Sequence, residues 1–104
     1  MRSEEYFNER NYTGYHYHEE CWEPVYNCYL ETIVEERIDG SWDVFLDEPL
    51  DDFENNILKK KENCQDTSTG LFLFNAKDKN DVTNKFKDWV ANVLIRLRNK
   101  KNRK

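Results

Sequence analysis

The clearest pattern in this sequence is an alternation of apolar and polar positions in the middle of the chain. Over residues 29–38, every second position on one face is apolar or β-branched, interrupted once by Glu36: Leu30, Thr32, Val34 and Ile38. Residues 41–46 repeat the alternation with Trp42, Val44 and Leu46. The intervening dipeptide Asp39-Gly40 tolerates the positive φ angles of a tight turn. The pattern therefore predicts two antiparallel strands joined by a two-residue turn.

Apolar residues at helical spacing predict a C-terminal helix over about 82–99. Its single apolar stripe consists of Val82, Phe86, Trp89, Val90, Val93, Leu94 and Leu97. Asn80 or Asp81 suits the N-cap of this helix, because a short polar side chain can accept a hydrogen bond from the first turn. Basic residues gather at its other end, where they favour the negative end of the helix dipole.

Two further elements are predicted between the hairpin and the C-terminal helix. Asp51-Asp52 can cap a short helix over about 53–63. The polar segment 64–70 ends in glycine and predicts a loop. The apolar run 71–74 that follows predicts a short buried strand.

These elements predict an α+β fold: a small antiparallel sheet, made of the hairpin and one further strand, with the C-terminal amphipathic helix packed on it. At 104 residues the chain is expected to form one domain over 1–104. Residues 1–24 show no clear period and predict an irregular, aromatic and acidic segment, although the Tyr/His alternation over 15–18 also allows a short strand. Residues 100–104 predict a frayed basic tail.

The sequence places the protein in the cytoplasm or the nucleus of its host cell rather than outside it. No stretch approaches the roughly 18 apolar residues of a membrane span, so we expect no membrane association. No leader pattern is visible at the N-terminus. The cysteines number three, Cys21, Cys28 and Cys64, and an odd number is a poor basis for a disulfide framework.

Charge is divided by position along the chain. Residues 1–56 carry a formal charge of −13, and residues 57–104 carry a formal charge of +8. The densest basic stretch has six positive side chains in nine residues: Arg96, Arg98, Lys100, Lys101, Arg103 and Lys104. Such a stretch can bind the phosphates of a nucleic acid without reading its sequence. The division would also arise if the charges served only solubility.

The acidic half supports an alternative function as an inhibitor or interaction protein. Closely spaced carboxylates on the hairpin can imitate a row of phosphates and bind a basic surface of a host protein, and the candidate partner-binding residues are Glu31, Glu35, Asp43 and Asp47. The exposed edge of the hairpin could also pair with a second copy of the chain, so a homodimer is a further possibility.

Residue types that bind metals occur early in the chain, but their spacing is not that of a metal site. His16, His18, Cys21 and Cys28 are candidate zinc ligands, but they match no common finger spacing, and exposed histidines with core cysteines are the simpler interpretation. No phosphate-binding glycine loop or nucleophile–base arrangement stands out. We therefore expect no cofactor, no metal and no catalytic residues.

The last third of the chain resembles the end of the BRO N-terminal domain of large DNA viruses and phage antirepressors. The residues that carry the resemblance are Gly70-Leu71-Phe72, Lys85-Phe86 with Trp89-Val90, Val93-Leu94 and Arg98. The segment 38–45 also looks like the hairpin of that domain, so the resemblance covers about residues 30–100.

The chain departs from the family's pattern in three places, one of which is the segment between the hairpin and the following strand, because it is shorter than usual and lacks a clear second helix. The chain is also one residue short between Trp89 and Val93, and Ile95-Arg96 stands where Leu-Pro would continue. The resemblance implies a DNA-binding module in which the phosphate contacts are Lys85, Lys87, Arg96 and Arg98. The leading hypothesis is therefore a small non-enzymatic viral or phage regulator that contacts nucleic acid through its basic C-terminal helix.

Overall fold

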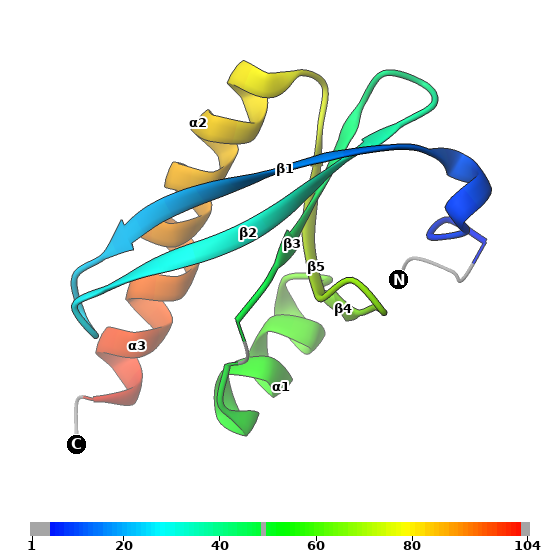
Figure 1. Cartoon of the computed structure of the whole chain (residues 1–104). Coiled ribbons are helices and arrows are strands. Elements are labelled where there is room, and N and C mark those ends of the chain that lie inside the picture. The colour runs from blue at the N-terminus through cyan, green and yellow to red at the C-terminus, as the bar shows by residue number, and fades with distance from the viewer. Residues whose placement is uncertain (1–4, 49, 103–104) are drawn as a thin grey trace.

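The computed structural model describes residues 5–48 and 50–102, which form a sheet with helices on one of its faces (Figure 1). The elements in chain order are η1 (Glu9–Asn11), β1 (Tyr12–Glu23), β2 (Cys28–Arg37), β3 (Trp42–Leu46), α1 (Asp52–Lys61), β4 (Gln65–Asp66), β5 (Leu71–Ala76), α2 (Lys79–Trp89), η2 (Val90–Leu94) and α3 (Ile95–Lys101). The strands pair antiparallel in the order β1-β2-β3-β5-β4. The predicted α+β fold, with its hairpin and its C-terminal helix, is confirmed.

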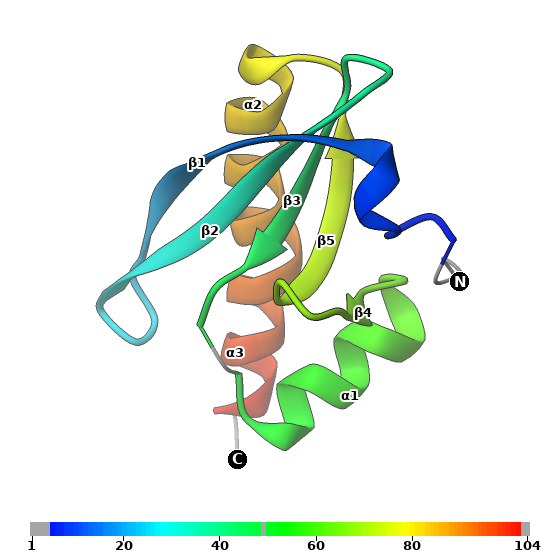
Figure 2. The same ribbon diagram turned by 45° about the vertical axis from the view of Figure 1, so that its right-hand side comes forward.

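The core lies between the sheet and the helices. Segments α2, η2 and α3 run on as one helix behind the sheet, and α1 lies beside β4 (Figures 1 and 2). The side chains that fill the space between the layers are at most 1% exposed and include Val34, Val44, Leu58, Val82, Phe86 and Leu94. Removing these apolar surfaces from water is the main force that holds the helices on the sheet.

The hairpin of β2 and β3 forms where the alternation predicted it, but its turn is longer than two residues. The backbone N–H of Arg37 donates to Ser41 O at 2.8 Å, and the N–H of Gly40 donates to Arg37 O at 2.9 Å. Residues 38–40 therefore form a three-residue loop. Gly40 has a φ of +90°, which is the left-handed position that such a loop assigns to glycine.

Strand β1 corrects the prediction of an irregular segment over 1–24, because residues 12–23 form a strand that pairs with β2. Its inward side chains Tyr17, Glu19 and Cys21 are only half-buried, and its outward ones are mostly polar. An edge strand of this kind has no apolar alternation to detect. A bulge between Tyr12 and His16 interrupts its pairing. Residues 1–4 lie outside the described part of the chain.

The C-terminal helix begins earlier than the predicted Asn80 or Asp81 cap. The N-cap is Asp78, whose side chain accepts a hydrogen bond from the backbone N–H of Asp81 at 2.8 Å. The helix continues to Lys101, so the first two residues of the expected frayed tail over 100–104 are helical. Residues 103–104 lie outside the described part of the chain.

The π-helical turn η2 changes which side of this helix faces the core. In an uninterrupted α-helix the apolar stripe would continue through Val93 and Leu97. A π turn holds more residues than an α turn, so the inward face moves by about one position. As a result Leu94, which also belongs to the predicted stripe, and Arg98 are buried, whereas Val93 and Leu97 are only half-buried.

The predicted short helix and the third strand are both present. Asp51 caps α1 by accepting a hydrogen bond from the N–H of Glu54 at 2.8 Å. The segment 64–70, predicted as a loop, contains the two-residue strand β4. Gly70 lies so close to β3 that a Cβ atom there would be 2.4 Å from Leu46 O, which explains why this position has no side chain.

Candidate functional site

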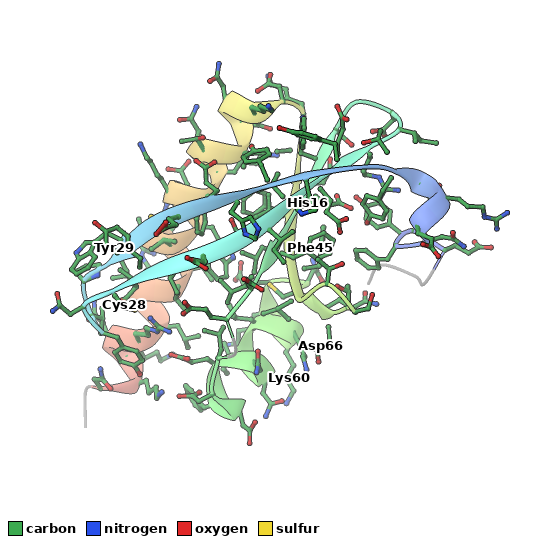
Figure 3. The ribbon with its side chains drawn as sticks, viewed as in Figure 1. His16, Cys28, Tyr29, Phe45, Lys60 and Asp66 are labelled. Atoms are coloured by element: carbon green, nitrogen blue, oxygen red, sulfur yellow. The ribbon has the colours of Figure 1, made fainter. Side chains whose placement is uncertain are left out.

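One face of the sheet is not covered by helices along β1 and β2, and we call it the open face. Because side chains alternate along a strand, β1 and β2 contribute every second residue to it. These residues form four cross-strand pairs: His16 with Glu35, His18 with Ile33, Glu20 with Glu31, and Trp22 with Tyr29. Figure 3 shows His16 near the middle of the sheet and Tyr29 at the start of β2, next to the turn that joins β1 to β2.

The outer end of the open face combines exposed aromatic rings with carboxylates. Trp22 and Tyr29 are 45% and 58% exposed, and their ring centroids are 5.0 Å apart in an edge-to-face arrangement. Glu20 and Glu31 lie directly opposite one another, and both are exposed. The backbone N–H of Asp47 donates to Glu31 O, which brings a third exposed acidic residue to this end. Like charges placed directly opposite one another destabilise a sheet, so folding alone does not account for them.

Toward its other end the open face contains a hollow of about 440 Å³. The hollow lies between the β1 bulge, the segment before it and the loop 67–69, and Phe45 lines it. Two carboxylates, Glu9 and Glu35, also line it, together with five hydroxyl side chains and no basic residue among the part of the chain that the structure describes. The Glu35 carboxylate accepts a hydrogen bond from Thr69 Oγ1 at 3.1 Å. The lining is therefore suited to a cation.

Asp43 lies on the same side of the sheet but is fully buried. Its carboxylate is 2.8 Å from Arg37 Nη1 and accepts hydrogen bonds from the Tyr6 and Tyr12 hydroxyls and from the Asn75 amide, each at 2.8 Å. Burial, followed by the bond to Asp43, raises the pKa of the Tyr12 phenol. This corrects the expectation that Asp43 could contact a partner, because all of its hydrogen-bonding capacity is used inside the fold.

Arg98 is buried in the same manner on the helix side of the sheet. Its Nε lies 2.9 Å from Glu54 Oε2, and its Nη1 lies 3.1 Å from Glu23 Oε2. The Tyr26 ring covers the guanidinium, with the guanidinium carbon 4.1 Å from the ring centroid. Arg98 itself is 4% exposed. This corrects its assignment as a phosphate contact, because the guanidinium faces two carboxylates rather than solvent.

Two of the other basic candidates also have internal partners. Lys101 pairs with Asp51 and donates to the Tyr26 hydroxyl, and these contacts raise the pKa of its ammonium. Lys85 donates to Asn75 O at 3.0 Å and lies 3.4 Å from Asp81. Lys85 is still exposed, and so are Lys87, Arg96 and Lys100 along α2 and α3.

The candidate metal ligands do not come together. His16 and His18 lie on the open face, whereas Cys21 and Cys28 lie on the helix side of the same two strands. In the described ranges, no three His, Cys, Asp or Glu side chains are grouped closely enough to hold a metal ion.

Sequence reasoning named Glu31, Glu35 and Asp47 as closely spaced carboxylates of the hairpin but missed what surrounds them. Glu20, Trp22 and Tyr29 were not identified, and neither was the hollow. A signal for the first two was present, because β1 places His16, His18, Glu20 and Trp22 at every second position.

Comparison with known proteins adds no family or relative. No protein-family model matches the sequence, and searches of curated proteins and of solved structures give no significant match. The resemblance to the BRO N-terminal domain therefore stays a prediction. Within the described residues, no helix has both the length and the apolar character needed to cross a lipid bilayer.

Proposed function

We propose that this protein is a non-catalytic binding protein that uses the open face of its sheet to hold a basic segment of another protein. The observation that carries the proposal is the uncovered end of the face, where Glu20 and Glu31 oppose each other beside Trp22 and Tyr29. By occupying such a segment the protein would block the partner's other contacts, which is the action expected of a small acidic inhibitor.

Lysine and arginine side chains suit this surface for two reasons. A cation placed over an exposed aromatic ring gains about 0.5–1 kcal/mol, and arginine stacks well on Trp. The carboxylates beside the rings can then pair with the same cation or with its neighbour along the partner. The hollow lined by Glu9 and Glu35 offers a second place for a cationic side chain on the same face.

Within residues 5–48 and 50–102, Glu20, Glu31 and Asp47 form no ion pair with a basic side chain. Arg37 and Arg98 are each held by buried carboxylates, and Lys101 pairs with Asp51. The negative potential of the open face is therefore available to an external partner. Because exposed charges act mainly on encounter, we expect association to be fast and to slow steeply with added salt.

The test measures binding of a fluorescein-labelled peptide of alternating arginine and glycine by anisotropy. Changing Glu20 and Glu31 together to Gln should weaken binding by up to about thirtyfold, from two exposed pairs of up to about 1 kcal/mol each. A matched control changes Glu62 and Asp88, exposed acids outside the open face, to Gln and Asn. Equal losses in the two double variants would show that only net charge matters and would reject this site.

A second candidate function is nucleic-acid binding by the C-terminal helix, as the sequence suggested for a viral or phage regulator. The observation that favours it is the exposure of Lys87, Arg96 and Lys100 along α2 and α3. A gel-shift titration with duplex and single-stranded DNA and RNA, at low and physiological salt, tests it. Changing these three residues to Gln should abolish salt-dependent binding, and absence of binding at low salt would reject this function.

A further inference from the structure

Three aromatic rings surround the ammonium group of Lys79 at the start of α2. The distances from Lys79 Nζ to the ring centroids are 5.3 Å for Tyr15, 5.2 Å for Tyr17 and 5.4 Å for Trp42. The two tyrosine rings meet the Trp42 ring nearly edge-on, with interplanar angles of 77° and 72°. We call these three rings the aromatic cage; it forms on the helix side of the sheet, opposite the open face.

This arrangement is suited to a cation without strong hydrogen-bonding needs. A cation within about 6 Å of a ring centroid is attracted by the negative face of the ring, and several rings around one cation are used to recognise quaternary ammonium groups. Glu36 lies directly opposite Trp42 in the pairing of β2 with β3, so a carboxylate lies beside the cage. Burial raises the pKa of Tyr17 to about 12, so this wall stays neutral at physiological pH.

The position of Lys79 in the cage does not stabilise helix α2. It occupies the first turn of α2, where the positive end of the helix dipole disfavours a cation. Across the described residues its ammonium forms no ion pair or hydrogen bond, and its side chain is exposed. In the part of the chain that the structure describes, the Lys79 ammonium is therefore held by its contacts with the rings, and a better cation can replace it.

We propose that Tyr15, Tyr17 and Trp42 form a binding site for a trimethylammonium cation, and that Lys79 occupies this site when no ligand is bound. The ligand group is a trimethylated lysine side chain or the head of choline, which share this chemistry. Trimethylammonium suits the cage better than a primary ammonium, because it loses less hydration when the rings surround it. This site is independent of the open face, so either proposal can fail without the other.

The test is a titration of the ¹⁵N-labelled protein with tetramethylammonium chloride, with sodium chloride at equal ionic strength as the reference. The indole N–H of Trp42 should shift in a saturable manner, while those of Trp22 and Trp89 report any non-specific effect. The Lys79→Gln variant should bind about two- to fivefold more tightly, because the internal competitor is gone. The matched control Lys77→Gln removes the same charge from an exposed position just before α2 and should leave the affinity unchanged.

The Tyr15→Leu variant tests the cage by removing one of its rings. Tyr15 is 51% exposed, so its replacement leaves the core intact, and it should weaken tetramethylammonium binding at least twofold. Tighter binding of a trimethyl-lysine peptide than of its unmodified form would identify trimethylated lysine as the source of the ligand group. Tighter binding of choline than of either peptide would identify choline. No saturable shift of Trp42, or equal gains from the Lys79 and Lys77 variants, would overturn the proposal.

Discussion

Replacement of Arg98 by methionine should strongly destabilise the protein, because it leaves two buried carboxylates without their shared cation. Methionine keeps much of the volume and removes the charge. Arg98 lies 2.9 Å from Glu54 and 3.1 Å from Glu23, and the three side chains are at most 5% exposed. Breaking a buried ion pair by removing one partner costs about 3–5 kcal/mol.

The structure places the expected loss at the lower end of that range. Glu23 also accepts hydrogen bonds from the backbone N–H groups of Val25 and Tyr26, at 3.0 and 2.7 Å. Glu54 retains Lys101 at 3.8 Å. We therefore expect a loss of about 3 kcal/mol in the free energy of unfolding. For a domain of this size, that corresponds to a fall in Tm of roughly 12–24 °C.

Urea and thermal unfolding followed by circular dichroism measure this loss. The matched control is Arg96→Met, an exposed arginine on the same helix, which should change stability by less than about 0.5 kcal/mol. Adding Glu54→Gln to the Arg98 variant should recover part of the loss, because it removes one of the stranded charges. If the Arg98 and Arg96 variants were equally stable, the reasoning about the buried pair would be refuted.

Three further predictions follow from buried or crowded positions. Burial raises the pKa of the Cys64 thiol to about 12. At pH 8 its alkylation by iodoacetamide in the native protein should therefore be at least about a hundredfold slower than after unfolding, and it should accelerate as the pH rises. Peptide mass spectrometry measures the alkylation rate of both forms. Gly70→Ala should lower stability by about 1–3 kcal/mol in urea unfolding, because the new Cβ meets Leu46 O, and an unchanged midpoint would contradict that contact. Asp43→Asn should cost about 3 kcal/mol and release the segment before β1, which limited proteolysis would detect as a new early cleavage site near the N-terminus.

The parts of the fold that the sequence predicted are those whose burial follows a simple period. The hairpin alternates with one interruption at Glu36, and the C-terminal helix has one apolar stripe, so both were located from the sequence. Of strand β1 the sequence allowed only a short piece over 15–18, because one face of the strand is open and the other is only half covered, so apolar residues do not alternate along most of its length. The turn η2 was missed because a change of helical period has no composition signal, and it is this turn that brings Arg98 inward.

The charged residues were the least predictable part of the candidate site. A sequence pattern does not reveal that a charged residue is buried, yet Asp43 and Arg98 are both buried. Their partners can lie far away in the chain, as Glu54 does, 44 residues before Arg98. The aromatic cage depends on the register of β1 with β2 and on where α2 starts. Alternation could indicate that Tyr15 and Tyr17 share a face, but only the pairing of three strands brings Trp42 to them.

The ion pairs of Arg98 also bear on how the protein is made. During synthesis the ribosome releases β1 and α1 first, so Glu23 and Glu54 are in solution well before Arg98. Until α3 has emerged, both carboxylates stay hydrated, because burying a charge without its partner is costly. The chain therefore completes its folding after translation of α3 rather than strand by strand, and a nascent chain halted before Arg98 would be a ready substrate for proteases and chaperones.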